Sequence, residues 1–441
     1  MKSKMGIRLL LLLSLFTSYA SAEVLLFSKA YELALLNANA IKSSVYQAEA
    51  SKEKINQEYS KLYPQINFSA RYSKSDYAEN KNFRGSTNHI RQGLMNSTLS
   101  LQQSIYNADT YSRIAMETSR SKLYEIDTDL KKEELAQNVF KVYLDLLKSH
   151  NKIKLFESYL AYNKSRLDVL TKKYDMHLAN KMDLLQMRVE YSSSLIDLKK
   201  EKKLLKVNQL RLDQLIGDVE YELPTLDSNK QISDNIELMR TLFVNQGHSF
   251  EKNLKVLQAQ VSLKLAKEQV TNSFDAHLPR LDLQASASKY KTDDPTSDSA
   301  YSDVDQVALV LNIPIYSGGS VSSSVASSEL LSKARNEDLL NTKKEAKVEY
   351  NEKLAFFDAS SESVTMYKDA VASAELYVDA IEQGYNHGLK SIVDLNEAKN
   401  KLYEVKYKYV DNMYGMIDSY IALLRVTNNF ESLSLLDELV R

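Results

Sequence analysis

Cysteine is absent from this chain of 441 residues. Without cysteine the protein can form no disulfide, can offer no thiolate to a metal ion and can carry no lipid on an N-terminal cysteine. Packing and hydrogen bonds must therefore hold the fold together.

Catalytic sequence motifs are also missing. The six histidines stand singly, and the chain has no His-Glu-x-x-His, no Gly-x-Ser-x-Gly and no glycine-rich phosphate loop. A lone histidine is typical of a helix flank or a surface. The sequence therefore predicts that the protein is not an enzyme and that it needs no cofactor or metal.

A long hydrophobic run is lacking at the N-terminus. The chain begins with three basic residues within its first eight, then the short apolar run Leu9–Phe16 and the small residues Ala20-Ser-Ala22. This pattern is typical of a secretory signal peptide, and the run is shorter than the ~20 residues of a spanning anchor. We expect residues 1–22 to be a signal peptide cleaved after Ala22, and an uncleaved anchor is the alternative.

An excess of charge of either sign is lacking too. Once the three N-terminal basic residues are removed from the total of 57, 54 Lys and Arg remain against 58 Asp and Glu, which gives a net charge of −4. No block of basic residues is present. Nucleic acid is therefore not an expected partner, because its recognition depends on concentrated positive charge.

Glycine and proline are scarce, and two long stretches have neither. One lies between Gly93 and Gly217 and the other between Gly319 and Gly384. In the first stretch apolar residues recur at spacings of 3, 4 and 7, which is the coiled-coil period. A helix of the 66 residues Asp109–Tyr174 would be ~100 Å long, more than a compact domain can use. The predicted helices are about 109–174, 181–216, 319–385 and 391–427.

Four other segments alternate apolar with small or polar residues, which is the period of a strand. The predicted strands are about 65–75, 97–106, 280–290 and 306–316. They form two hairpins, and the polar stretches Lys74–Ser97 and Lys291–Gln306 are expected to be loops. A surface sheet on a soluble core fits the alternation, but the strand lengths also suit a tilted crossing of a bilayer.

The whole plan occurs twice. Tyr174 to Met187 repeats as Tyr385 to Ala398, 211 positions later, and each half reads helix, hairpin, very long helix, tight turn, helix. We therefore divide the chain into a first repeat at 23–217, a linker at 218–250, a second repeat at 251–427 and a tail at 428–441.

Four strands cannot close a barrel, and an open edge in lipid leaves backbone groups unpaired at several kcal/mol each. A membrane interpretation therefore requires several copies of the chain. Two copies would give eight strands and a filled interior, whereas three would give twelve strands and a lumen. The long helices of three copies would continue that pore as a hollow cylinder.

Several motifs resemble those of the TolC family of outer-membrane channel proteins, over essentially the whole mature chain. They are Leu101-Gln-Gln-Ser-Ile-Tyr106, Ala266-Lys-Glu-Gln269, His277-Leu-Pro-Arg-Leu-Asp282, Ile313-Pro-Ile-Tyr-Ser-Gly-Gly319, and Gly384-Tyr385 through Gly388 to Ile392-Val-Asp394. The resemblance implies an α+β membrane protein in the cell outer membrane. Each chain would give four strands to a trimeric twelve-stranded barrel and long helices to a periplasmic coiled-coil tunnel. The linker and tail would form an equatorial region.

The resemblance also implies a function and partners. The protein would be the passive exit duct of drug efflux or of type I protein secretion, gated at its periplasmic helical tip. Its partners would be two further copies of itself, outer-membrane lipid, a periplasmic adaptor and an inner-membrane exporter of the RND or ABC type. A periplasmic coiled-coil scaffold without a pore is the alternative, although it leaves the strands without a purpose. An autonomous porin would not need the helices.

The resemblance assigns roles to residues of the two turns. Asp394 and Glu397 match the family's acidic entrance ring, while Ser391-Ile-Val-Asp394 by itself is a helix-capping pattern. Tyr385 and Lys390 match the family's closed-state latch, with Asp183 as the acceptor. Tyr385 could instead simply pack as the last heptad residue.

The sequence departs from the family at the tip in two ways. The first turn has His177 where the second has Gly388, so any left-handed position there is filled by a less suitable residue. The basic residue of the tip is Lys390 rather than arginine, so it cannot form a bidentate fork.

Overall fold

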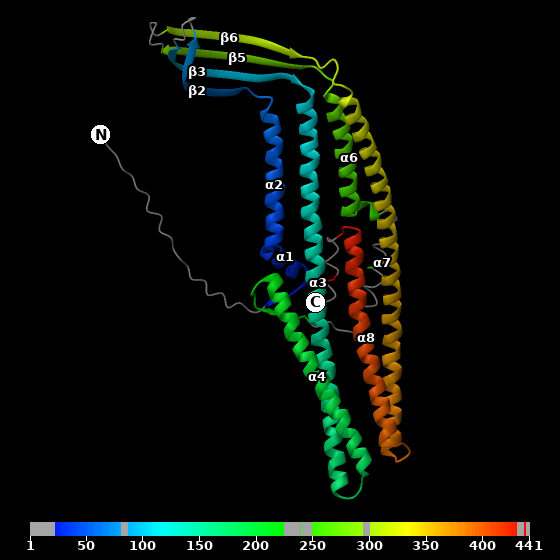
Figure 1. Cartoon of the computed structure of the whole chain (residues 1–441). Helices are drawn as coiled ribbons and strands as arrows, with labels where there is room; N and C mark the ends of the chain where they lie inside the picture. Colours follow the sequence, from blue (N-terminus) through cyan, green and yellow to red (C-terminus); the bar gives the residue numbers. More distant parts are fainter. Residues whose placement is uncertain are drawn as a thin grey trace, which may run out of the picture.

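The computed structural model describes residues 23–80, 87–224, 239, 249–293, 300–429 and 436–437. The predicted signal peptide 1–22 lies outside these residues, as does most of the predicted linker 218–250 and of the tail 428–441. In the described part a four-stranded sheet lies at one end of a long bundle of helices (Figure 1).

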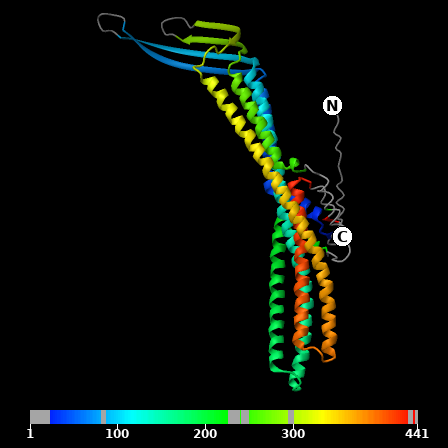
Figure 2. The same ribbon diagram turned by 90° about the vertical axis from the view of Figure 1, so that its right-hand side faces the viewer.

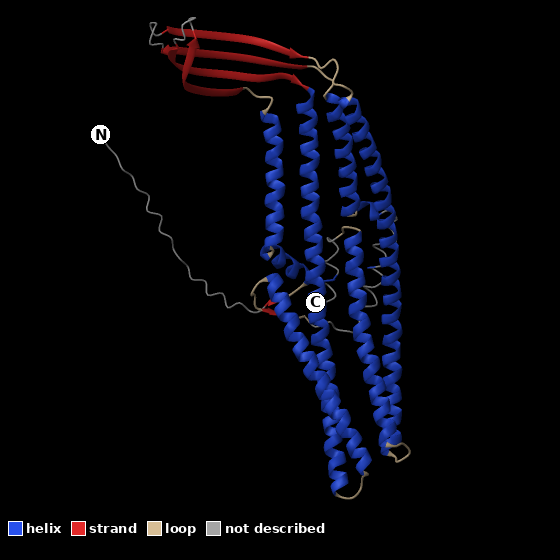
Figure 3. Cartoon of the chain, viewed as in Figure 1, coloured by secondary structure: helices blue, strands red, loops and turns tan. Residues whose placement is uncertain are grey.

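Each repeat contains the same succession of elements, which Figure 3 distinguishes by colour. The first repeat consists of α2 (Asn39–Ser60), β2 (Gln65–Asn80), β3 (Thr87–Asn107), α3 (Ala108–Asp175) and α4 (Lys181–Ile216). The second consists of α6 (Leu254–Asp275), β5 (Arg280–Asp293), β6 (Ala300–Asn312), α7 (Ser320–Asn386) and α8 (Ile392–Val426). The remaining elements are β1 (Glu23–Val24), α1 (Phe27–Asn37), β4 (Tyr221–Glu222) and the 3-10 helix η1 (Ser249–Lys252).

The four long helices begin and end within one residue of the ranges that glycine, proline and the heptad pattern predict. The longest, α3, has 68 residues, which corresponds to ~100 Å. None of the described helices contains an apolar stretch of the length that crossing a membrane demands.

The sheet is antiparallel with the strand order β2-β3-β5-β6. One row across it consists of Ile66, Leu101, Ala285 and Val307, which are direct partners and so share a face. The next row, one residue along each strand, is Asn67, Ser100, Ser286 and Gln306, on the opposite face. The sheet therefore has one apolar and one small polar face, and β2 and β6 are its edges.

All four strand predictions were wrong in at least one limit. The expected loops are too long, because β2 continues to Asn80, β3 begins at Thr87, and β5 and β6 also extend into the second polar stretch. A strand ladder joins backbone groups, so it can continue where the side chains of both faces are polar. The predicted strand 306–316 ends at Asn312, because Asn312 pairs with the first residue of β5 and none of the described strands lies beyond it.

In each repeat two short helices lie end to end alongside one long helix (Figure 2). The side chain of Asn37, at the end of α1, donates hydrogen bonds to the carbonyl oxygens of Gln214 and Leu215 in the last turn of α4, each at 3.2 Å. Asn253, before α6, donates in the same way to the carbonyl of Val426 at the end of α8, at 3.2 Å. An asparagine therefore satisfies the free carbonyls of a helix end at both junctions.

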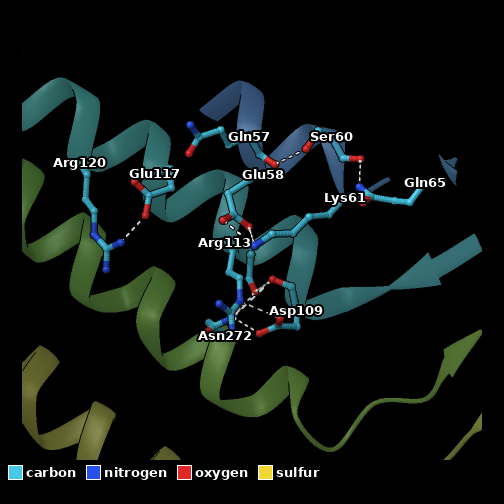
Figure 4. Close-up of polar contacts among 11 residues, drawn as sticks. Gln57, Glu58, Ser60, Lys61, Gln65, Asp109, Arg113, Glu117, Arg120 and Asn272 are labelled. Carbon is cyan, nitrogen blue, oxygen red and sulfur yellow. Dashed lines mark hydrogen bonds and ion pairs between the residues drawn. The ribbon is translucent and has the colours of Figure 1, made fainter. Parts of the chain in front are cut away.

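Polar contacts join α6 to α3 next to the sheet, as Figure 4 shows. β3 passes into α3 without a loop, and Asp109 lies in the first turn of that helix. The side-chain amide of Asn272 on α6 donates to Asp109 Oδ1 at 2.8 Å and to Ser112 Oγ at 2.9 Å, and Arg113 Nε donates to Asp109 Oδ2 at 2.7 Å. The two bonds of Asn272 join α6 to α3 at the point where the chain leaves the sheet, and the bond of Arg113 lies within α3.

The main hydrophobic core lies at mid-height, where α1, α3, α4 and α8 meet. Phe27 of α1 is fully buried, and its ring centroid lies 4.8 Å from that of Tyr143 in an edge-on arrangement. The Tyr143 hydroxyl donates a hydrogen bond to the carbonyl oxygen of Leu25. Leu25 in turn continues β1, which pairs in parallel with β4. The start of the described chain is therefore built into the centre of the bundle.

Candidate functional site at the helical tip

The turn between α7 and α8 is a Schellman motif. The amide of Leu389 donates to the carbonyl of Gly384 at 2.8 Å, and that of Gly388 donates to the carbonyl of Tyr385 at 3.0 Å. Gly388 has φ = 72°, which glycine adopts without strain. A Cβ on Gly384 would lie 2.8 Å from Lys390 Cγ, so the lack of a side chain there leaves room for Lys390 to fold back over the end of α7.

The turn between α3 and α4 has the same backbone. The amide of Leu178 donates to the carbonyl of Lys173 at 2.7 Å, and that of His177 donates to the carbonyl of Tyr174 at 2.9 Å. His177 has φ = 59°, so the left-handed position exists and histidine fills it. A residue with a Cβ pays a steric penalty of ~1 kcal/mol or more in this conformation. The first turn is therefore the more strained copy.

The capping interpretation of Asp394 holds in the structure. The Ser391 hydroxyl accepts from the amide of Asp394 at 3.1 Å, and Asp394 Oδ2 accepts from the amide of Ser391 at 2.8 Å, which makes a complete capping box at the start of α8. The hydrogen bonds from the Ser391 backbone and hydroxyl hold the pKa of the Asp394 carboxyl below its usual range. The box is therefore intact above the ordinary carboxyl pKa and is lost only as the pH falls through the lowered one.

Glu397 lies one turn further along α8 and is exposed. Within the described part of the chain its carboxylate makes no hydrogen bond or ion pair. Asp394 and Glu397 are three residues apart, so they lie on neighbouring positions of one helix face. Asp394 is therefore engaged in the capping box, whereas the carboxylate of Glu397 is free to contact other groups. Among the described residues, no group of three or more His, Asp and Glu is placed to hold a metal ion.

The three predicted latch residues are not bonded to one another within this chain. Asp183 lies half-buried in the first turn of α4, and neither Tyr385 nor Lys390 makes a hydrogen bond or ion pair with it in the described structure. The Tyr385 ring packs against the small apolar cluster of α7 and α8 at the tip. On its other side it faces cations of α3, with Arg166 Cζ 5.3 Å and Lys173 Nζ 5.9 Å from the ring centroid.

Arg166 is a residue of the tip that the sequence did not predict. Its guanidinium lies 3.7 Å from a carboxylate oxygen of Glu382 on α7, and Lys399 of α8 lies 3.0 Å from the other oxygen of Glu382. This ion-pair group joins the first repeat to the second. A signal for it was present, because Glu382 stands three residues before Tyr385 and so on the same helix face. Its partner on α3 could come only from the tertiary fold.

A second group of polar contacts joins the repeats more than two helical turns above the tip. Asn400 of α8 accepts a hydrogen bond from the Tyr159 hydroxyl of α3 and donates to Glu190 of α4 at 3.5 Å. The rings of Tyr159 and Tyr403 stack with centroids 4.2 Å apart. The two helix pairs are therefore held together here by polar and aromatic side chains.

The two turns give a matched test of backbone strain. Replacing His177 by Gly should make the first turn more stable by up to ~1 kcal/mol, because glycine removes the left-handed penalty. Gly388→His should weaken the second turn by a similar amount, since a Cβ there meets open space and the cost lies in the backbone alone. Hydrogen exchange at the amides of Leu178 and Leu389, which close the turns, would measure both effects. Equal exchange in the two variants and the parent would show that φ does not limit these turns.

The sequence matches a known protein family and several of its members. The model of the outer membrane efflux protein family matches residues 30–218 and 248–429. The outer membrane protein TolC of Escherichia coli K12 is 26% identical over 427 residues, which cover 95% of this chain and 84% of TolC. The protease secretion protein PrtF of Dickeya chrysanthemi is 20% identical, with 94% of this chain and 90% of PrtF covered.

The fold itself matches a solved structure. The outer membrane protein VceC of Vibrio cholerae superposes with a TM-score of 0.73 at 16% identity, over 91% of this chain and 95% of VceC. The two parts of the family match coincide with the two repeats, and the interval between them falls in the predicted linker. The chain belongs to the outer membrane efflux protein family.

Proposed function

We propose that the protein is the outer-membrane exit duct of a tripartite export system for drugs or for secreted proteins, and that it works as a homotrimer. The observation that carries this is the sheet, which has one apolar face, one polar face and two open edges at the end of helices of ~100 Å. Three copies would close its four strands into a barrel of twelve.

The family match and one relative support the two kinds of export. The matching family is that of outer membrane efflux proteins, and PrtF is a protease secretion protein. The sequence has no phosphate-binding loop with which a nucleotide could be bound and hydrolysed. A passive duct of this kind needs a partner that supplies the energy for export. A periplasmic adaptor and an inner-membrane RND or ABC exporter would fill these roles, with the adaptor contacting the helical tip. The equatorial region would comprise 218–250 and 428–441.

The proposal predicts a conducting trimer. Protein extracted from outer membranes in mild detergent should have three times the mass of the mature chain, and it should form channels in planar bilayers. Analytical ultracentrifugation with correction for bound detergent would measure the mass. A monomer that forms no channels would favour a periplasmic scaffold instead.

At the tip, three copies would bring six carboxylates from Asp394 and Glu397 around one entrance. A ring of fixed negative charge attracts cations, and it should hold multivalent cations strongly enough to block conduction. Because the pKa of Asp394 is lowered, its carboxylate stays negatively charged at pH values where an ordinary carboxyl group would be protonated.

Glu397→Gln tests the ring, because it removes three of the six charges and leaves the capping box intact. We expect reduced cation preference and weaker block by multivalent cations, with Asp394→Asn/Glu397→Gln losing both. Reversal potentials and block titrations in planar bilayers would measure this. Glu362→Gln, at an exposed position in the middle of α7, is the matched control. Unchanged selectivity in the double variant would leave Asp394 with a capping role only.

The latch of the closed state would join the two repeats at the tip. Tyr385 and Lys390 supply donors and Asp183 supplies the acceptor, and the contacts of Arg166 with Glu382 and Tyr385 support an attachment of the same helix pairs. An exposed ionic link contributes only ~0.2–1 kcal/mol, but three symmetric copies act together. A total of a few kcal/mol shifts a closed-to-open equilibrium by orders of magnitude.

The double variant Tyr385→Phe/Lys390→Ser should therefore raise single-channel conductance strongly while the melting temperature of the trimer stays nearly the same. Tyr377→Phe, which removes an exposed hydroxyl two turns further up α7, should change neither. If Tyr385 only packs against the apolar cluster, the double variant lowers stability and leaves the conductance at the closed level.

A further inference from the structure

One arginine of the sheet makes no hydrogen bond or ion pair among the described residues. Arg71 lies on β2, is exposed, and is the direct partner of Asn96 on β3. Asn96 continues the row to Tyr290 on β5, and Tyr290 continues it to Ser302 on β6. Because directly paired residues share a face, these four side chains belong to the same side of the sheet.

The face that carries Arg71 is the small polar one. Arg71 stands four residues after Asn67, which is two full periods of a strand, and Asn67 begins the polar row described above. In the rows of this face from Gln65 to Ser73, none of the other residues has a charged side chain. Arg71 is therefore a single positive charge on an otherwise neutral polar surface.

The described acidic side chains of the sheet lie on the other face or far along the strands. Three stand an odd number of residues from a member of the Arg71 row, which places them on the apolar face, and they are Asp76, Asp303 and Asp305. Asp282 shares the polar face, but it is eight residues from Tyr290, ~26 Å along β5. Arg280 lies 3.5 Å from Asp282. None of these carboxylates neutralises Arg71.

The row around Arg71 is rich in hydrogen-bond donors. A guanidinium has five N–H donors and no acceptor, and its planar fork matches two oxygens of a phosphate or carboxylate. Asn96 lies one strand away, at ~5 Å. Its Oδ1 accepts a hydrogen bond from the Thr98 hydroxyl at 3.1 Å, which leaves its amide group to donate. The Tyr290 hydroxyl adds a further donor, one strand beyond Asn96.

We propose that Arg71 and Asn96 form an anion-binding site for the phosphate or carboxylate groups of a solute in the lumen of the duct. The site rests on the proposed trimer, in which the polar face surrounds the lumen and three copies would provide three such sites. Arg71 is six residues from the start of β2, ~20 Å along the strand, so it lies well inside the barrel. A charge at this depth suits the lumen, because charged side chains destabilise the lipid face of a barrel.

The second repeat provides a matched position without the charge. The first strands of the two hairpins repeat at an offset of 215 residues and the second strands at an offset of 210, as shown by Pro64 with Pro279 and Tyr106 with Tyr316. The pair Arg71–Asn96 therefore corresponds to Ser286–Gln306, which is a pair of the second hairpin. Ser286 thus occupies the place of Arg71 in its own hairpin, next to another side-chain amide, so the charge can be moved between the hairpins.

Binding of tripolyphosphate to the purified protein in mild detergent tests the site. Isothermal titration calorimetry at low ionic strength should find three equal sites per trimer in the parent. Arg71→Ser should raise the dissociation constant at least about tenfold, because a charge-assisted hydrogen bond is lost. Arg71→Lys should bind with intermediate affinity, since an ammonium group keeps the charge without the planar fork. Arg71→Ser/Ser286→Arg should recover most of the affinity of the parent.

Lys289→Ser is the matched control, because the exposed Lys289 stands one residue before Tyr290 and so on the opposite face at the same level. It should leave binding unchanged. Equal affinity in Arg71→Ser and the parent would overturn the site, as would loss of binding in Lys289→Ser alone. Either result leaves the proposed duct standing when Arg71→Ser is still a trimer that forms channels in planar bilayers. A parent protein that is neither trimeric nor conducting would overturn the proposed function and the site with it.

Discussion

The structure depends on the unpaired backbone at the two edges of its sheet. β2 and β6 each offer a row of amide and carbonyl groups that no other strand of the described structure satisfies, and in lipid each such group costs several kcal/mol. Ordinary devices for protecting an edge, such as a covering helix, are not used in the described structure, since all helices leave from one end of the sheet (Figure 1). In the proposed trimer, association with further copies would satisfy the edges, and the same association would surround a lumen with the polar face.

The contacts between the two repeats differ in kind along the length of the helices. At mid-height the repeats meet through a large apolar core that includes the fully buried Phe27, Phe140 and Tyr420. Near the tip they meet through Arg166 with Glu382 and through Asn400 with its two neighbours. Polar contacts can exchange with water, whereas separating an apolar core exposes it at ~25 cal/mol per Å². Separation of the helix pairs is therefore least costly at the tip, which is where a duct must open.

The sequence predicted the helices well because their signals are local. Proline and glycine are excluded from a long helix, and the heptad pattern needs no knowledge of partners. The strand limits were less predictable for two different reasons. The ends toward Asn80 and Thr87 are rich in polar residues in the sequence, so the alternation fades while the ladder continues. At the other end Ile313–Tyr316 has the pattern of a strand, but the described structure holds no strand that pairs with it. Arg166 escaped prediction because only the fold brings it to Glu382.

The turns at the tips of the two repeats share a backbone conformation but carry different side chains. Their backbones follow the same hydrogen-bond pattern, yet the second turn has Gly388, a capping box and both acids, whereas the first has the strained His177 and Gln186 at the position that matches Glu397. A turn without strain and with a doubly bonded cap keeps its shape when the helices around it move. If the proposed entrance ring and latch are correct, the second repeat would be the rigid moving element that presents charge to the pore, and the first would be the surface against which it closes.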